Sequence, residues 1–188
     1  GKFNTYADTA LYLKMVEYFH REYSESTIFK VQYTEAAFGA IEKQNGDFVV
    51  VKSSNMHFHV ADGSYFIIRP KGKNVEISTF FVANKGKGLG THLMKIILTA
   101  WTNAIVEVEE SQHGTLVLDC TGSIMINGEL VNNPIGRQIH FFSKFGFEVD
   151  KVVDEPIKGF GWVKMKMTNY QIVLRVVQKY IANIQEYA

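Results

Sequence analysis

The spacing of apolar residues divides the first part of the chain into helical and extended segments. From Thr9 to about Tyr23 apolar residues recur every three or four positions, which predicts a first helix. A second helical stretch is predicted from Thr34 to Lys43, before the turn Asn45-Gly46-Asp47. The pattern then changes, because Phe48–Lys52 is a β-branched run that indicates a strand.

The next segments predict an antiparallel meander. Met56–Val60 and Tyr65–Arg69 flank Ala61-Asp62-Gly63, which is a hairpin signal. The turn Lys71-Gly72-Lys73-Asn74 then leads into Val75–Val82, which we expect to form a third strand. Because strands joined by tight turns pair antiparallel, three consecutive antiparallel strands are predicted here.

Two helices and a buried strand follow. A long helix is predicted from Leu89 to about Glu110, and Leu116–Cys120 has the continuous apolar character of a fully buried strand. A further helix fits Pro134 to Lys144, with Asn133 as its N-cap and Pro134 at its first helical position. The buried face of the long helix comprises Leu93, Ile96, Ile97, Ala100, Trp101 and Ala104.

The chain ends in two strands and a last helix. The strands are Phe147–Val153 and Trp162–Met167, and Thr168 or Asn169 caps the helix. Helical crossovers in the middle and hairpins at the ends predict an α/β (α+β) fold, with a mixed, mostly antiparallel sheet and helices on both faces. The helix carries an apolar stripe of Val173, Val177, Tyr180, Ile184 and Tyr187.

Length and composition are those of one globular domain spanning residues 1–188. The 188 residues contain no internal repeat or low-complexity linker, and 46% are apolar and 21% charged. A formal net charge of +1 gives no specific signal for nucleic acid. No apolar run approaches the roughly 20 residues that span a bilayer, so no membrane partner is expected.

Three further sequence features are considered as possible functional sites. Cys120 is the only cysteine, which excludes an intramolecular disulfide and favours a reducing, cytoplasmic setting. We expect it to be a buried structural thiol rather than a nucleophile. His57 and His59 alternate on one strand face without a clear third ligand, so no metal site is expected. Leu116–Ser123 resembles the start of a methyltransferase cofactor site, but the preceding meander argues against that function.

A glycine-rich turn between the third strand and the long helix is the main candidate for a binding site. Gly86, Gly88 and Gly90 stand at alternate positions, where positive φ would turn successive N–H groups onto one anion. Lys85 and Lys87 add positive charge. The spacing matches neither a P-loop nor a dinucleotide fingerprint. We predict a diphosphate-binding turn, the alternative being a flexible basic loop.

These residues resemble a known family. Lys85-Gly86-Lys87-Gly88-Leu89-Gly90 is similar to the Gln/Arg-x-x-Gly-x-Gly/Ala signature of the GNAT superfamily of acyl-CoA-dependent N-acetyltransferases, with Lys85 in the first slot. Gly90–Met94 and Glu76-Ile77 look like the histone acetyltransferase branch. Phe141–Glu148 is similar to the family's Tyr-x-x-x-Gly-Phe motif. The resemblance runs from about Phe48 to Met167.

The resemblance implies a GNAT-like domain with a core over about 48–167 and an extra C-terminal helix over 169–187. It implies acetyl-CoA as cosubstrate and no metal. A bulge near the end of the third strand of the meander, which is the family's fourth strand, would let the pantetheine arm pair with the backbone of Phe80, Phe81 and Val82. Phe142 and Lys144 would lie beside the coenzyme. The diphosphate would be held by Lys85, Gly86, Lys87, Gly88, Leu89, Gly90 and Thr91.

The same resemblance implies direct attack of a primary amine on the thioester. Glu76 matches the catalytic glutamate of the histone acetyltransferase branch and is the first choice for the base; Asp119, Glu129 and His140 are the backups. Alternatively, Glu76 is a solvent-facing strand residue, because strand alternation does not decide which face is wet. The backbone N–H of Val82 would polarise the thioester carbonyl.

One departure bears on catalysis. Phe142 occupies the slot in which many family members have a Tyr that protonates the departing thiolate, and a phenyl ring donates no proton. Three alternatives remain. Water or another hydroxyl donates the proton to the thiolate, the thiolate leaves without a proton donor, or the protein binds acyl-CoA without efficient turnover. The predicted function is N-acetyl transfer to a small molecule or protein, with a non-catalytic acyl-CoA-binding or interaction protein as the alternative. We expect a monomer or homodimer.

Overall fold

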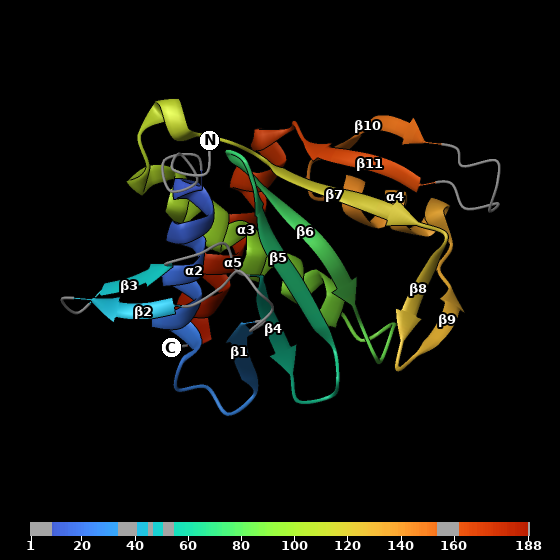
Figure 1. The fold of residues 1–188 in the computed structure, drawn as a ribbon, viewed down its shortest axis with the longest axis horizontal. Coiled ribbons are helices and arrows are strands. Elements are labelled where there is room, and N and C mark those ends of the chain that lie inside the picture. The colour runs from blue at the N-terminus through green and yellow to red at the C-terminus, as the bar shows by residue number, and fades with distance from the viewer. Residues whose placement is uncertain (1–8, 34–40, 45–46, 51–54, 154–161, 188) are drawn as a thin grey trace. The chain divides into compact units, whose positions relative to one another are not determined.

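The computed structural model describes residues 9–33, 41–44, 47–50, 55–153 and 162–187. It divides into two compact units, Gly1–Gly114 and Thr115–Ala188 (Figure 1). The predicted mixed α/β class is confirmed: seven strands make up the main sheet, four in the first unit and three in the second, and the pairs within each unit are antiparallel. The interpretation as a single domain stays a prediction.

The first unit contains the predicted meander with one additional strand. Its strand order is β1-β4-β5-β6, in which β1 was not predicted. A separate hairpin pairs β2 with β3. The bounds are β1 Phe29–Tyr33, β2 Ile41–Gln44, β3 Asp47–Val50, β4 Met56–Val60, β5 Tyr65–Lys71 and β6 Asn74–Phe81.

The predicted second helix is wrong where it can be compared with the structure. Ile41–Gln44 forms strand β2 and pairs antiparallel with β3, whereas Thr34–Ala40 lies outside the described residues. Cross-strand pairing supplies the backbone hydrogen bonds of this segment, and such tertiary context overrides a weak helical pattern. The predicted strand from Phe48 is confirmed as part of β3, up to Val50.

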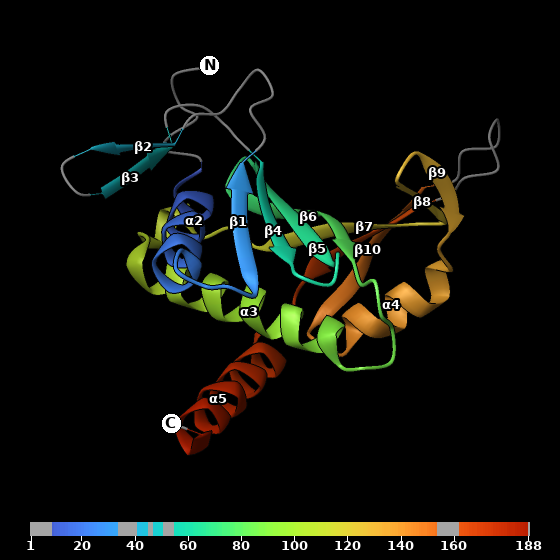
Figure 2. The same ribbon diagram turned by 90° about the horizontal axis from the view of Figure 1, so that it is seen from below.

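Two helices pack on the same face of the first unit's sheet (Figure 2). Helix α2, Ala10–Tyr23, places the ring of Phe19 at 5.6 Å from Phe58 and 5.8 Å from Phe66. Helix α3, Leu89–Glu107, stacks His92 on Phe29 at 6.3 Å. Phe29, Phe58 and Phe66 share a face by strand register. Helices on both faces are therefore not found among the described contacts of this unit.

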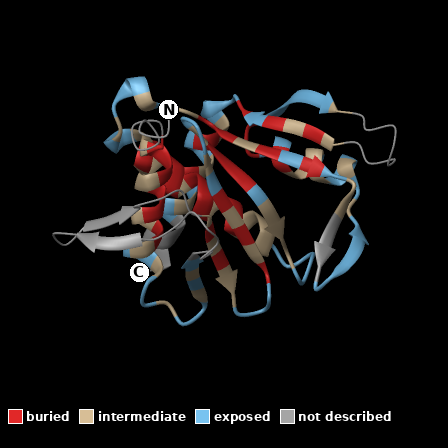
Figure 3. Ribbon diagram, viewed as in Figure 1, coloured by how far each residue is buried: buried red, intermediate tan, exposed pale blue. Residues whose placement is uncertain are grey.

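The two faces of the first unit's sheet differ in burial (Figure 3). Met56, Phe58, Phe66 and Ile68 are fully buried on the inner, helix-covered face. The opposite, outer face carries the aromatic row His59, Tyr65 and Phe81, whose rings are only partly buried. An outer face with imidazole, phenol and charged groups is a poor partner for an apolar helix stripe, which explains the one-sided arrangement.

The second unit contains strands in the order β7-β11-β10 and helices α4 and α5. A separate hairpin pairs β8 with β9 and turns at Asn127-Gly128. Helix α4 begins after Pro134 as its N-cap, one position later than predicted with Asn133. The bounds are β7 Leu116–Thr121, β8 Ser123–Ile126, β9 Glu129–Asn132, α4 Ile135–Ser143, β10 Phe147–Val153, β11 Trp162–Met167 and α5 Tyr170–Tyr187.

Gly146 organises the end of α4. Its φ of 101° is left-handed, and an added Cβ would lie 2.6 Å from the carbonyl oxygen of Asn169. The carbonyl of Gly146 accepts hydrogen bonds from the N–H groups of Thr168 and Asn169 at 3.0 and 3.1 Å. The side chain of Asn169 accepts from the N–H of Ile172 at 3.4 Å, so Asn169 is the cap of α5. The Gly-Phe motif therefore joins α4 to the start of α5.

In the part of the chain that the structure describes, none of the helices combines the length and the apolar character that crossing a membrane requires.

Candidate functional site

The glycine turn lies between the end of β6 at Phe81 and the start of α3 at Leu89. Gly86 and Gly88 have φ angles of 86° and 78°, in the region that favours glycine. An added Cβ at either would meet nothing within 4 Å, so backbone conformation rather than crowding demands glycine there. Gly90 differs, because it is the second residue of α3 and its φ is not positive.

The first backbone N–H groups of α3 have no acceptor within the helix. The first helical bond runs from the N–H of His92 to the carbonyl of Gly88 at 3.0 Å, so the N–H groups of Leu89, Gly90 and Thr91 precede the helical hydrogen bonds. The first turn of α3 carries no acidic residue. Three N–H groups at the positive end of a helix dipole suit an anion.

Two exposed lysines flank these N–H groups. Lys85 and Lys87 lie in the turn itself, and both are exposed. A diphosphate requires open space, backbone N–H donors and mobile cations. The turn provides all three, with the open space beside its two left-handed glycines. The residues present therefore fit the diphosphate of an acyl-CoA.

A hairpin outside the predicted motif braces the turn. The fully buried Ser64 accepts a hydrogen bond through Oγ from the N–H of Ala83 at 2.8 Å. Its own N–H donates to Oδ1 of Asp62 at 2.8 Å, and the Asn84 amide donates to Oδ2 at 3.3 Å. Hydrogen bonds from the Ser64 backbone and side chain lower the pKa of Asp62. The hairpin was predicted from Asp62-Gly63, but nothing in the sequence indicated its bond to the turn.

Strand β6 carries a bulge at Ser78. Ile67 pairs with Thr79 and Ile68 with Ile77, which leaves Ser78 as the extra residue. The bulge reverses the alternation beyond it, so that Phe81 shares the outer face with Glu76 while Phe80 turns inward opposite Phe66. Phe80 and Phe81 remain paired with β5, and Val82 follows the strand. The bulge thus lies earlier than the strand end at which the resemblance places it.

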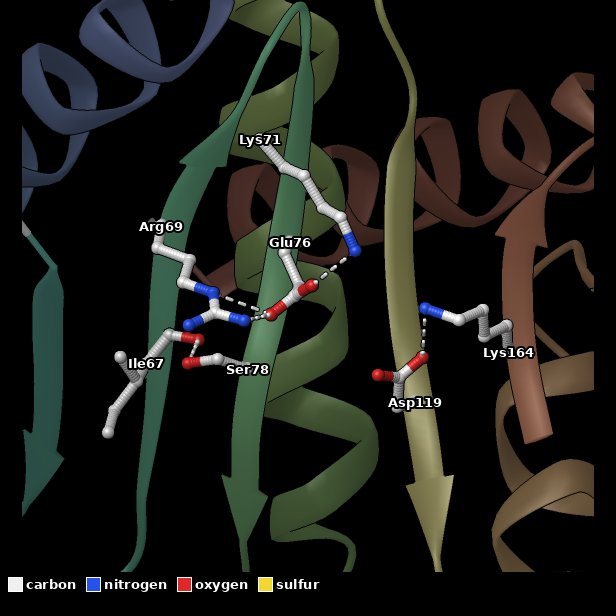
Figure 4. A network of polar contacts seen from close by, with 7 residues as sticks. All are labelled: Ile67, Arg69, Lys71, Glu76, Ser78, Asp119 and Lys164. Carbon is white, nitrogen blue, oxygen red and sulfur yellow. Dashed lines mark hydrogen bonds and ion pairs between the residues drawn. The ribbon is translucent and has the colours of Figure 1, made fainter. Parts of the chain in front are cut away.

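Glu76 is held by two cations on the outer face (Figure 4). Oε1 accepts a hydrogen bond from Nε of Arg69 at 2.6 Å and forms an ion pair with Nη2 of Arg69 at 2.6 Å, and Oε2 accepts a hydrogen bond from Nζ of Lys71 at 3.1 Å. The Glu76 residue is only 4% exposed. The alternative of a solvent-facing glutamate is therefore wrong: Glu76 is a buried, ion-paired carboxylate.

The backup candidates belong to the second unit. Asp119 on β7 forms an ion pair of 3.7 Å with Lys164, its cross-strand partner on β11 (Figure 4). Glu129 is an exposed residue at the start of β9, and His140 is exposed on α4. Asp119 is thus occupied by a structural contact, and the described surroundings of Glu129 and His140 give neither of them a partner that would tune a base.

Phe142 and Cys120 are core residues of the second unit. Phe142 is 6% exposed, and its ring packs edge-on against those of Phe141 and Phe147 at 5.1 and 5.9 Å. Burial, and next the charge of Asp119, raise the pKa of the Cys120 thiol to about 12. Cys120 is therefore protonated near neutral pH, as expected of a structural thiol. Lys144 follows α4 as an exposed residue.

Two histidines lie side by side on the outer face of β4. The rings of His57 and His59 stack at 5.8 Å. Desolvation lowers the pKa of both, with smaller contributions from His59 on His57 and from Lys30 on His59. Both imidazoles are therefore neutral at pH 7. Among the described residues no group of three or more His, Cys, Asp or Glu side chains could hold a metal ion.

Comparison with known proteins gives similarity at the level of the fold. No family model matches the chain, and no curated protein matches it. An acetyltransferase from Bacillus cereus ATCC 14579 is 12% identical, with a TM-score of 0.36, over 81% of this chain and 84% of that one. A "putative acetyltransferase" from Agrobacterium tumefaciens is 12% identical, with a TM-score of 0.31, over 86% of this chain and 90% of that one.

Proposed function

We propose that this protein is an N-acetyltransferase that transfers the acetyl group of acetyl-CoA to a primary amine by direct attack. The observation that carries the proposal is the turn into α3. It combines two left-handed glycines, Gly86 and Gly88, with the exposed cations Lys85 and Lys87 at a helix start. Such a turn suits a diphosphate, and it directly follows a bulged strand.

The chain's own groups would hold the coenzyme as follows. The N–H groups of Leu89, Gly90 and Thr91, with Lys85 and Lys87, bind the diphosphate. The backbone of Phe80–Val82 faces the pantetheine arm, and the N–H of Val82 polarises the thioester carbonyl. Phe142 and Lys144, which the family resemblance also assigns to the coenzyme, belong to the second unit and stay predictions.

Acetyl-CoA supplies an activated thioester. The amine nitrogen forms the new C–N bond, the C–S bond breaks, CoA leaves as a thiolate, and the amine gives up one proton. Glu76 is our proposed base, because its carboxylate lies on the outer face that also carries Phe81. Arg69 and Lys71 occupy both of its oxygens, so one of these contacts has to open before Glu76 accepts the proton.

Acetyl-CoA binding tests the turn assignment. Isothermal titration should detect binding to the wild type and no binding to Gly88→Val. Gly72→Val is the matched control, because Gly72 also has positive φ, at 59°, and open space around it but lies in the β5–β6 turn. The control should keep its acetyl-CoA affinity. Unchanged affinity in a folded Gly88→Val protein would remove the proposed site.

Release of free CoA thiol in the presence of a panel of amines tests the chemistry. We expect amine-dependent release, and Glu76→Gln should lower kcat by about 100-fold or more while sparing acetyl-CoA affinity, as for loss of a general base. A Glu76→Gln protein with an unaltered rate would exclude Glu76 as the base.

A second candidate function has its own support. Phe142 cannot donate a proton, and both oxygens of Glu76 are engaged by cations. Both observations favour a protein that binds acyl-CoA without efficient turnover. Tight acetyl-CoA binding with no thiol release across the amine panel would select this candidate and exclude the first.

A further inference from the structure

Glu76 differs sharply in exposure from the two charged side chains that contact it. The side chain of Glu76 is 5% exposed, whereas those of Arg69 and Lys71 are 49% and 50% exposed. The carboxylate is therefore enclosed, whereas its two cations are about half exposed.

Most of the hydrogen-bond donors on these cations are not used by Glu76. A guanidinium has five N–H donors, and Arg69 donates one from Nε to Oε1 and places Nη2 in an ion pair with the same oxygen. An ammonium has three donors, and Lys71 directs one to Oε2. A guanidinium fork and an ammonium that contact the two oxygens of one carboxylate also match the oxygens of a second carboxylate or of a phosphate group.

The charge on the sheet of the first unit favours an anion. Its strands β1, β4, β5 and β6 contain Lys30, Arg69 and Lys71, and Glu76 is the only acidic residue in these four described strands. His57 and His59, with lowered pKa, do not add charge at pH 7. Lys73, in the adjoining turn, adds another exposed cation. These four strands therefore carry more positive than negative charge.

We propose that Arg69 and Lys71 bind an anionic group of the acceptor, so that the acceptor is an amine that also carries a carboxylate or phosphate. This inference rests on the proposed acetyltransferase function and specifies its second substrate. The arriving anion competes with Glu76 for Arg69 and Lys71. It thereby frees a Glu76 oxygen to take the proton that the amine loses. The two cations make Glu76 available as a base only when a suitable acceptor is bound.

Matched amine pairs test the inference by binding as well as by turnover. Phosphoethanolamine is compared with ethanolamine, and β-alanine with propylamine, each titrated by isothermal calorimetry into protein saturated with CoA. We expect the anionic member of at least one pair to bind 10-fold or more tightly, which corresponds to about 1.4 kcal/mol or more. The two pairs distinguish a phosphate from a carboxylate ligand.

Variants locate the anion contact. Lys71→Gln should weaken binding of the anionic amine about 10-fold or more and leave the neutral partner unchanged. Because Arg69→Gln alone leaves Glu76 buried with one cation, which threatens folding, Arg69→Gln/Glu76→Gln removes both charges together and should abolish the preference. Lys151→Gln, an exposed lysine on β10, is the matched control and should keep it.

The outcomes separate this inference from the function on which it rests. Equal binding of both members in every pair, or a preference that survives in Lys71→Gln and in the double variant, would overturn the anion site. An anion preference that depends on Arg69 and Lys71 without CoA release from any amine would support the site and overturn the acetyltransferase. Failure of the wild-type protein to bind acetyl-CoA would overturn the proposed function, whereas the anion preference of Arg69 and Lys71 would still be measured with the amine pairs alone.

Discussion

Ser64 and Ala83 are 19 positions apart in sequence, yet the Ser64 hydroxyl accepts a 2.8 Å hydrogen bond from the Ala83 N–H. Ser64 belongs to the β4–β5 hairpin turn, and Ala83 opens the glycine turn that leads to α3. The bond fixes the first residue of a turn whose central glycines carry no side chains to hold it in place. A rigid hairpin therefore positions the candidate anion site.

Replacing Ser64 by Ala should loosen this turn. The variant leaves the Ala83 N–H without its acceptor, so the free energy of unfolding should fall by about 1 kcal/mol and acetyl-CoA affinity should fall several-fold. Urea unfolding and isothermal titration measure the two effects. Ser64→Thr keeps the hydroxyl and should restore part of the affinity, whereas full affinity in Ser64→Ala would show that the brace does not position the turn.

The glycines of the turn should respond differently to alanine. Gly88→Ala forces an L-residue to a φ of 78° and should reduce stability by about 1–2 kcal/mol. Gly90→Ala places a better helix former inside α3 and should leave stability equal or higher. Urea unfolding compares the two proteins, and equal losses would contradict the distinction. Acetyl-CoA titration of Gly90→Ala separately tests whether a ligand approaches that position closely.

Gly114 lies against the β5–β6 turn. A Cβ there would overlap the backbone carbonyl of Lys73, which no side-chain movement relieves. Gly114→Ala should therefore destabilise by about 3 kcal/mol or more, beyond ordinary overpacking of a core. A Cβ added to Gly136, on α4, would have nothing within 4 Å, and Gly136→Ala should be neutral or stabilising. Thermal unfolding of the pair checks the contrast.

Stability should decrease as the pH falls below about 6.5. Desolvation lowers the pKa of His20, His57, His59 and His92 from the ordinary 6.5. The unfolded chain then binds protons that the folded chain does not, so stability is complete above pH 6.5 and declines as the pH drops toward the folded pKa values. Asp62 acts separately, because its lowered pKa costs stability only below about pH 3.8.

Thermal unfolding at several pH values between 5 and 8 measures this dependence. The variant His57→Gln/His59→Gln removes two of the four groups and should reduce the change in unfolding temperature across this range. A dependence that is equally steep in this variant would assign it to other groups.

Local sequence predicted most of the elements correctly. The correctly predicted features depend on short stretches of sequence. They are the hairpin at Asp62-Gly63, the periodic apolar stripe of α3 and the Gly146-Phe147 junction. Thr34–Lys43 was misread over its described part, because β2 depends on pairing with β3. Strand β1 was missed for the same reason, since its hydrogen-bond partners lie in β4, well along the chain.

In the candidate site, too, some features follow from local sequence and others depend on tertiary structure. The sequence by itself determined the glycine turn, its two lysines and the absence of a hydroxyl at Phe142, because each depends on residue type and short spacing. Only the tertiary structure decided which face Glu76 occupies, since the bulge at Ser78 reverses the alternation from which a face would be inferred. The short β5–β6 turn sets Arg69 opposite Glu76. Whether this cluster lies on the helix-covered face or on the outer face was decided only by the packing of α2 and α3 against the sheet, which depends on contacts between segments far apart in the chain.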